Sequence, residues 1–201
     1  MKKSNPKTTM IIMLLVCLTP VIASYLAYYV FKPTAKNNHG VLISPQKDIP
    51  VISTIKMEST INSANNLQEL KGKWLLVIAG SAECNEECAK RLFIIRQLRN
   101  SQGKEANRIV PVWLIMDNKD IDPTITRAYN DYLAAVKFIR VDEKSKTDIE
   151  KLLHISQKDK YTDNIYLIDP NQHLMMYYTK EHEPKGMIKD LSKLLKWSRI
   201  G

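Results

Sequence analysis

The hydrophobic positions at the N-terminus form one unbroken block. Between Lys7 and Lys32 the chain has 24 residues without a charged side chain. As a helix, at 1.5 Å per residue, such a segment extends about 36 Å, which is enough to span a bilayer core of about 30 Å. We therefore expect a transmembrane helix over residues 10–31, in which Pro20 is tolerated because neighbouring groups can satisfy the freed carbonyl.

The charges around this block indicate its orientation. Lys2, Lys3 and Lys7 precede it, and the first acidic residue of the chain is Asp48. The positive-inside rule then keeps residues 1–9 in the cytoplasm and sends the remainder of the chain across the membrane. A cleaved signal peptide, with Met10–Thr19 as its hydrophobic region, is the alternative interpretation.

A polar segment rich in chain-breaking residues follows the apolar block. Residues 32–59 contain Pro33, Pro45, Pro50 and Gly40, which are residue types that punctuate regular structure. We expect residues 32–59 to be a linker and an irregular entry segment, followed by a folded domain over residues 60–201.

Apolar runs and helical periodicities alternate in the first half of that domain. Trp74–Ala79 and Ile109–Met116 are short continuous apolar runs, which indicate buried strands. Pro111 should lie at the start of the second strand or at an edge. Cys84–Asn100 has apolar residues at steps of three and four, which predicts a helix. Ile121–Val136 begins with an Asp-Pro pair, a helix-start signal.

The second half of the domain adds a strand, a helix with Ser145 as a possible N-cap, a hairpin and a closing helix. They cover, in this order, Lys137–Val141, Lys144–Leu153, Asn164–Ile168 with Leu174–Tyr178, and Pro184–Trp197. The order β-α-β-α-β-α-β-β-α predicts an α/β three-layer domain. A final hairpin followed by a helix is typical of the C-terminal half of a thioredoxin-like fold.

Composition and charge narrow the functional classes. The chain has 201 residues, of which 44% are hydrophobic, and 30 Lys and Arg against 21 Asp and Glu give a net charge of +9. The size favours one compact domain, and the mean hydropathy of −0.27 excludes several membrane spans. Basic and acidic residues are interleaved, so the chain lacks the clustered basic stripe of a nucleic-acid-binding protein.

The pair Cys84 and Cys88 is the strongest candidate for chemistry. It lies where the first predicted strand turns into its helix, and ligand sites in open α/β sheets lie beyond the carboxyl ends of strands. A helix N-terminus favours the thiolate form. If the turn is helical through both cysteines, their spacing places both thiols on one helical face. They could then form a disulfide or bind Cu(I).

Neighbouring acidic residues limit the reactivity that we expect of this cysteine pair. Glu83, Glu86 and Glu87 surround the pair, and negative neighbours disfavour a thiolate. We therefore expect a reactive pair without a strongly acidified thiol. A static disulfide, or two apolar residues facing the core, is the non-functional alternative.

Several short motifs carry a resemblance to a known family. They are Asn38–Ile43 after the apolar block, Gly72-Lys73-Trp74, the cysteine pair, Asp117, and Ile165–Pro170 with the sequence IYLIDP. On these motifs the chain resembles the SCO/SenC family of thioredoxin-like, membrane-anchored copper proteins that assist cytochrome c oxidase assembly. It looks closest to a divergent subgroup of bacterial membrane proteins.

The resemblance implies a location, partners and a metal. It implies a single-pass protein of the bacterial inner membrane with a periplasmic C-terminal domain. The implied partners are a respiratory oxidase subunit or another periplasmic thiol or copper protein. The implied metal site is copper held by Cys84 and Cys88, with a histidine a few residues before the strand of the IYLIDP motif.

That histidine is missing from this chain, because the corresponding stretch Asp159–Asn164 reads DKYTDN. His154 is a weaker substitute, since a histidine at a helix end more commonly interacts with the carbonyls there. Two thiolates alone can still hold Cu(I). In a thiol-disulfide oxidoreductase, Cys84 would attack and Cys88 would resolve the mixed disulfide. The competing hypothesis is a non-catalytic interaction module with a structural disulfide.

Overall fold

The computed structural model describes residues 6–29, 38–55, 57, 64–129, 136–198 and 200. The chain divides into two compact units, Met1–Asn37 and Asn38–Gly201.

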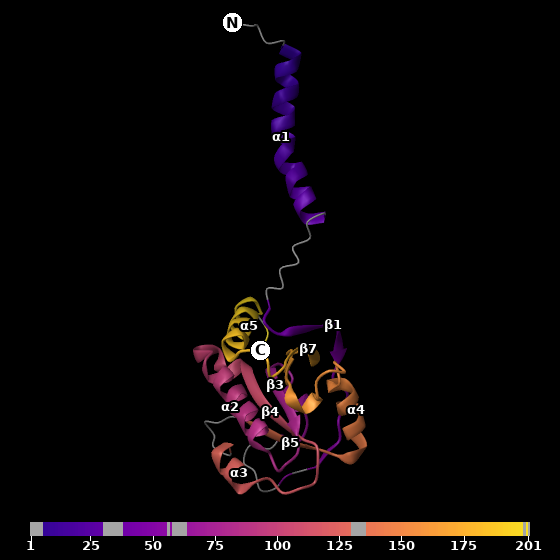
Figure 1. The fold of residues 1–201 in the computed structure, drawn as a ribbon, viewed down its shortest axis with the longest axis vertical. Helices are drawn as coiled ribbons and strands as arrows, with labels where there is room; N and C mark the ends of the chain where they lie inside the picture. Colours follow the sequence, from indigo (N-terminus) through magenta and orange to yellow (C-terminus); the bar gives the residue numbers. More distant parts are fainter. Residues whose placement is uncertain are drawn as a thin grey trace. The chain divides into compact units, whose positions relative to one another are not determined.

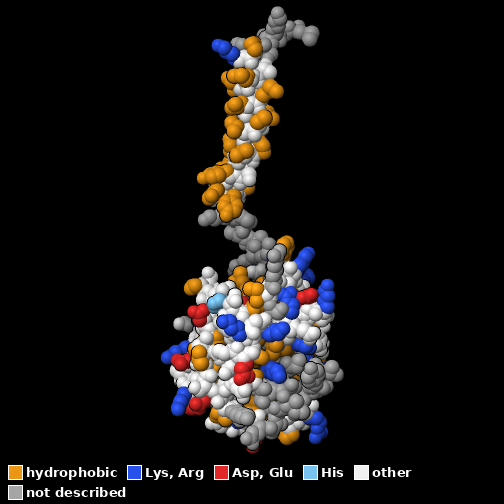
Figure 2. Space-filling model, turned by 180° about the vertical axis from the view of Figure 1, so that it is seen from behind, with side chains coloured by type: hydrophobic (Ala, Val, Ile, Leu, Met, Phe, Trp, Pro, Cys, Tyr) orange, Lys and Arg blue, Asp and Glu red, His pale blue; other side chains and the backbone are white. Residues whose placement is uncertain are grey.

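In the first unit, helix α1 covers Pro6–Tyr29, contains Pro20 and buries none of its residues. Hydrophobic side chains are exposed along its length on the side seen in Figure 2. Among the described residues, α1 alone has the length and hydropathy needed to cross a membrane. Residues 30 and 31 of the predicted span lie outside the described residues.

The second unit is built on a seven-stranded sheet with the order β1-β7-β6-β3-β4-β5-β2. The central strands β3, β4 and β5 are parallel, whereas β6 and β7 form the antiparallel hairpin predicted from the sequence. The strands are β1 (Val41–Asp48), β2 (Thr54–Ile55), β3 (Trp74–Gly80), β4 (Ile109–Ile115), β5 (Lys137–Val141), β6 (Ile165–Ile168) and β7 (His173–Tyr178).

Helices cover both faces of this sheet (Figure 1). One face packs against α2 and α5 in a core that includes Leu76, Leu92 and Leu191. The other face packs against α4 in a core that includes Leu75 and Ile149. The predicted three-layer α/β fold is therefore confirmed. The helices of this unit are α2 (Glu86–Asn100), α3 (Pro123–Tyr129), α4 (Glu143–Leu153) and α5 (Pro184–Trp197), with 3-10 turns at Gln68–Leu70, Gly103–Arg108 and Tyr161–Asp163.

The largest difference from the sequence analysis lies in the entry segment. Residues 32–59 were expected to be irregular, but β1 forms within them and pairs with β7 at the edge of the sheet. Only Ile43 of β1 is buried, so the strand lacks the alternating apolar pattern that would reveal it. Pro45 is tolerated because an edge strand has one unpaired side. The compact unit accordingly starts at Asn38 rather than at residue 60.

Three local expectations also change. Pro111 lies in a central strand. The pairing of β4 with β5 begins only at Val112, so the missing N–H of Pro111 falls before the first paired residue of β5.

The expectation that Ser145 caps its helix is wrong. α4 begins at Glu143, one residue before the predicted start, and its N-cap is Asp142. The buried Ser145 hydroxyl instead accepts the Ser53 N–H at 2.8 Å. The predicted helix over Ile121–Val136 is observed as α3, and its residues 130–135 lie outside the described residues.

Candidate functional site

The candidate site lies at the carboxyl edge of the central parallel strands. β3 ends at Gly80, and the next residues lead directly to the start of α2 at Glu86. β4 runs parallel to β3 and ends at the same edge, so Asp117, which follows β4, faces the loop after β3. This is the edge at which open α/β sheets place their ligands.

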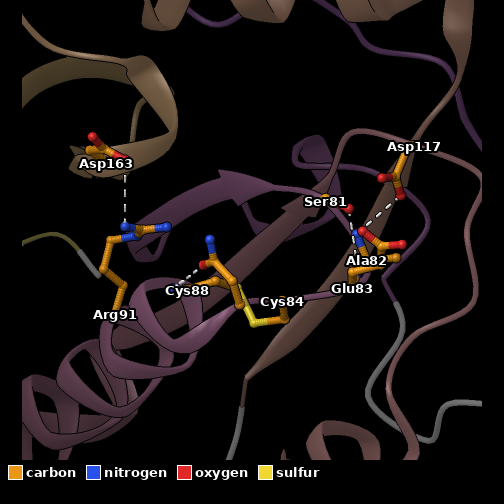
Figure 3. Close-up of a disulfide and its surroundings, with 9 residues drawn as sticks. Ser81, Ala82, Glu83, Cys84, Cys88, Arg91, Asp117 and Asp163 are labelled. Carbon is orange, nitrogen blue, oxygen red and sulfur yellow. Dashed lines mark hydrogen bonds and ion pairs between the residues drawn. A yellow bond between two sulfur atoms is a disulfide. The ribbon is translucent and has the colours of Figure 1, made fainter.

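Cys84 and Cys88 are joined by a disulfide at this edge, with Cα atoms 5.1 Å apart (Figure 3). Cys88 belongs to the first turn of α2. Asn85 is the N-cap, and its side-chain oxygen accepts the Cys88 N–H at 3.0 Å. Cys84 precedes the cap and has φ of +40°. The helix thus starts two residues later than predicted, and the two cysteines do not share one helical face.

Asp117 braces the loop that carries Cys84. Its carboxylate accepts the Ala82 N–H at 3.0 Å, and the Cys84 N–H is bonded to the Ser81 carbonyl at 3.2 Å. Partial burial of Asp117 on its own would raise the pKa of this carboxyl, but hydrogen bonds from Ser81, Ala82 and Lys119 outweigh it and lower the pKa. The loop is therefore fixed by an ionised side chain at neutral pH.

The disulfide borders a cavity of about 290 Å³. Cys84 and Cys88 are 9% and 5% exposed, so little of the disulfide is open to solvent. The other lining residues come from the loop, from the first turns of α2 and from the 3-10 turn before β6; they are Gly80, Ser81, Glu83, Asn85, Glu87, Arg91, Thr162 and Asp163.

Arg91 is the main electrostatic feature that sequence reasoning missed. Its side chain is 11% exposed, and its guanidinium lies 3.9 Å from the Asp163 carboxylate (Figure 3). Burial lowers the pKa of Arg91, and the charges of Asp163 and Glu87 oppose that effect. The only sequence signal was the position of Arg91 one helical turn after Cys88. Asp163 lies in the stretch where the resemblance implies a histidine.

The negative charge around the disulfide is lower than the sequence suggested. Of the three neighbouring glutamates, Glu83 is paired with Lys119 at 3.0 Å, and Arg91 supplies a further positive charge at the cavity wall. Since opposite charges favour a thiolate, these two cations partly offset the glutamates.

The histidines of the chain do not complete a metal site with the cysteines. His154 is exposed at the end of α4, which packs on the other face of the sheet from α2. His39, His173 and His182 bond elsewhere, and none of the four lines the cysteine cavity. Within the described ranges, no group of three or more His, Cys, Asp or Glu side chains is arranged to hold a metal.

The residues present therefore do not fit the two-cysteine, one-histidine copper site that the resemblance implies. Asp163 lies in the stretch where the resemblance implies a histidine, and its carboxylate is 3.9 Å from the Arg91 guanidinium. A carboxylate is also a hard oxygen ligand, unlike the soft donors that Cu(I) prefers. Only the two sulfur atoms, after reduction, remain as a soft donor set.

Comparison with known proteins agrees with this fold. Residues 74–198 match the family described as transmembrane-like, thioredoxin-like, C-terminal domain. The site and fold define a thioredoxin-like domain, and the chain belongs to this family. No curated protein matches it.

Solved structures of Sco proteins share the fold. Yeast Sco1 with copper bound is 13% identical, with a TM-score of 0.56, over 78% of this chain and 96% of the yeast chain. Arabidopsis thaliana ScoI with copper bound is 15% identical, with a TM-score of 0.53, over 66% and 90%. BsSco, a member of the Sco family of cytochrome c oxidase assembly proteins described with a disulfide switch, is 16% identical, with a TM-score of 0.52, over 78% and 99%. The resemblance to SCO/SenC proteins is thereby confirmed at the level of the fold.

Proposed function

We propose that this protein is a membrane-anchored thiol-disulfide exchange protein that acts in cytochrome c oxidase assembly, with its domain in the periplasm of a bacterial inner membrane. The observation that carries the proposal is the Cys84–Cys88 disulfide at the mouth of a cavity, at the carboxyl edge of β3 and the start of α2. The fold shared with BsSco, in which a disulfide switch is identified, supports it.

The size of the disulfide loop favours exchange over a purely structural role. The bond joins residues only four positions apart. In the chain-entropy view a loop this short stabilises a fold by about 2 kcal/mol. Extensive hydrophobic cores already hold both faces of the sheet. The loop's contribution of about 2 kcal/mol is at the lower end of the usual range of about 2–4 kcal/mol. Together with the position of the disulfide beside a cavity, it favours exchange over a purely structural role.

The exchange step needs only the two cysteines and a client thiol pair. In the reducing direction, the Cys84 thiolate attacks one sulfur of a client disulfide, and the other client sulfur leaves as a thiolate. The Cys88 thiolate then attacks Cys84 Sγ, which releases the second client thiolate and restores the Cys84–Cys88 bond. Overall the client S–S bond breaks and the Cys84–Cys88 S–S bond forms, so two electrons pass from the cysteine pair to the client. The reverse sequence starts from the Cys84–Cys88 disulfide and oxidises a client dithiol. Cys84 is the attacking residue because it is slightly more exposed than Cys88 and precedes the helix.

Trapping tests the assignment of roles. In the Cys88→Ser protein, a client or a model disulfide should remain covalently bound through Cys84, and reducing agent should release it. The matched Cys84→Ser protein should trap less, because Cys88 is the less exposed of the two and lies within the first turn of α2. Equal trapping by both variants would show that the assigned order is wrong.

The reduction potential separates exchange from the interaction-module alternative. An exchange protein should have a potential between about −270 and −120 mV, the range of known thiol-disulfide oxidoreductases. A structural disulfide should lie below about −300 mV, beyond reduction by glutathione. The measurement is equilibration of the wild-type disulfide with glutathione or dithiothreitol buffers.

Copper delivery is the second candidate, and one observation favours it: the two sulfur atoms meet at the same cavity in a fold that copper-bound Sco structures share. Here Cu(I) is cargo, held after reduction by the thiolates of Cys84 and Cys88. Anaerobic competition with a Cu(I) chelator should then show one metal per reduced chain and none for the Cys84→Ser/Cys88→Ser double variant. Equal binding by both proteins, or none by either, would remove this candidate.

A further inference from the structure

Helix α5 presents a basic face that contains no exposed acidic side chain. Lys185, Lys189, Lys193 and Lys196 are all exposed along Pro184–Trp197. The only acid of this helix is Asp190, which is 3% exposed and holds the N–H groups of His39 and Gly40. The exposed side of α5 therefore carries four positive charges that its own helix does not neutralise.

An exposed aromatic residue ends this face. Trp197 is 77% exposed, and the Lys196 ammonium lies 5.9 Å from the centre of its ring. Beside it is a shallow groove of about 270 Å³ whose apolar lining includes Trp74, Leu194 and Ile200. Tryptophan next to lysine is typical of surfaces at a membrane interface, where the ring and the aliphatic stem enter the headgroup region while the charge stays in water.

The chain enters the domain at this same helix. The backbone N–H groups of His39 and Gly40 donate to Asp190 at 2.9 and 2.8 Å, and the His39 side chain lies against Gly186. From Tyr29, the last residue of α1, to Asn38 there are nine residue steps, which reach at most about 32 Å. α5, with 14 residues, is about 21 Å long. The connecting chain can therefore extend farther than the length of α5.

We propose that the exposed face of α5, formed by Lys185, Lys189, Lys193, Lys196 and Trp197, binds the headgroups of anionic phospholipids in the membrane that anchors the chain. The lysine charges complement the negative lipid surface, and the tether keeps the local lipid concentration high. This proposal is independent of the redox role.

The contact is compatible with an open cysteine site. The Trp197 groove includes Trp74, the first residue of β3, whereas the cysteine cavity includes Gly80, the last residue of that strand. The two sites therefore lie at opposite ends of one strand. Lipid bound near Trp197 would leave the disulfide accessible to a client.

The fluorescence of Trp197 provides a direct test with the full chain in lipid nanodiscs. The chain has three tryptophans, of which Trp74 and Trp113 are 5% and 0% exposed. Brominated lipids should therefore quench mainly Trp197, and the Trp197→Phe protein gives the background to subtract. Quenching of the Trp197 signal should be at least about twofold stronger when phosphatidylglycerol is mixed with phosphatidylcholine than in phosphatidylcholine alone.

Substitution of the four lysines then separates charge from simple proximity. Lys185, Lys189, Lys193 and Lys196, all changed to Gln, should abolish the dependence on phosphatidylglycerol. The matched control, with Lys144, Lys151, Lys158 and Lys160 changed to Gln, removes the same charge from other exposed positions and should retain it. Urea unfolding verifies that both variants are folded. Equal quenching in the two lipids, no quenching in either, or loss of the dependence in both variants would overturn the proposal.

Discussion

Arg91 and Asp163 show how single side chains set the chemistry of the cysteine cavity. Both line it, and their charges face each other at 3.9 Å rather than in a tight hydrogen bond. Arg91 also has an Nε atom without a partner among the described residues. A cation that is only loosely paired can interact with a thiolate that forms on reduction.

This arrangement predicts opposite effects of two substitutions in α2. Arg91→Gln removes a cation that stabilises the reduced, anionic form, so the reduction potential should become more negative. A shift on the order of 30 mV corresponds to a tenfold change in the exchange equilibrium. Glu87→Gln removes an anion from the same cavity and should shift the potential in the positive direction. Equilibration with glutathione measures both, and shifts of the same sign would contradict the role assigned to Arg91.

His173 gives a pH-dependent contribution to stability. Its imidazole lies 3.0 Å from Asp169 and 3.3 Å from Asp48 on β1. The hydrogen bond to Asp169 raises the pKa of His173, and the charges of Asp169 and Asp48 act in the same direction against partial desolvation. Because the folded pKa is the higher one, this stabilisation is fully present below the unfolded pKa of about 6.5 and is lost as the pH rises through the folded value.

The expected result is a pH-dependent difference between the wild type and His173→Gln. In urea unfolding of the full chain in detergent, the wild type should be the more stable protein at about pH 5.5. The difference should shrink at about pH 8.5, on the other side of the ordinary histidine pKa. Asp148, exposed on α4, supplies a control variant, Asp148→Asn, without this link between β1 and β7. A difference that grows as the pH rises would contradict the assignment.

At the scale of elements, helix α5 packs closely against the entry segment where Gly186 meets the His39 side chain. A Cβ atom at Gly186 would lie 2.7 to 2.8 Å from atoms of the His39 side chain, closer than van der Waals contact allows. Alanine in place of glycine normally favours a helix by about 1 kcal/mol. Here the crowding of the His39 ring opposes that gain.

Gly186→Ala should therefore destabilise the domain, by roughly 1–3 kcal/mol, as expected when a packed site is overfilled. The control is Lys189→Ala at an exposed position of the same helix, which changes helix propensity without a clash. The double variant Gly186→Ala/His39→Ala should recover part of the loss, since it removes the ring that is crowded. Urea unfolding provides the comparison, and stabilisation by Gly186→Ala alone would mean that His39 does not pack there.

At the scale of the whole molecule, we expect the fold to persist without the disulfide, because its loop is short and both faces of the sheet have a hydrophobic core. Cys84→Ser/Cys88→Ser should lower the free energy of unfolding by about 2 kcal/mol or less, and cooperative unfolding should persist. The matched comparison is the wild type with and without reducing agent, which should give a similar loss. A collapse of the fold on reduction would instead support the structural-disulfide alternative.

The parts of this fold that could be predicted are those whose signal is local. β3, β4, the β6–β7 hairpin and α5 have continuous or periodic apolar patterns, and the cysteine pair is visible from its spacing. β1 was missed because it buries one residue and contains proline. The roles of Ser145 and of the Arg91–Asp163 pair depend on partners that are 92 and 72 positions away in the sequence, respectively, and local patterns do not report them.

The clamp at Asp190 also determines how the domain would carry a mechanical load. A pull on the chain that precedes the domain arrives at His39, where the carboxylate of Asp190 holds two successive backbone N–H groups. Beyond it the force meets the pairing of β1 with β7 at the sheet edge. β7 and β6 stand between β1 and β3, which leads to the cysteines. Along this route, tension would peel an edge strand before it reaches the strand that leads to the disulfide.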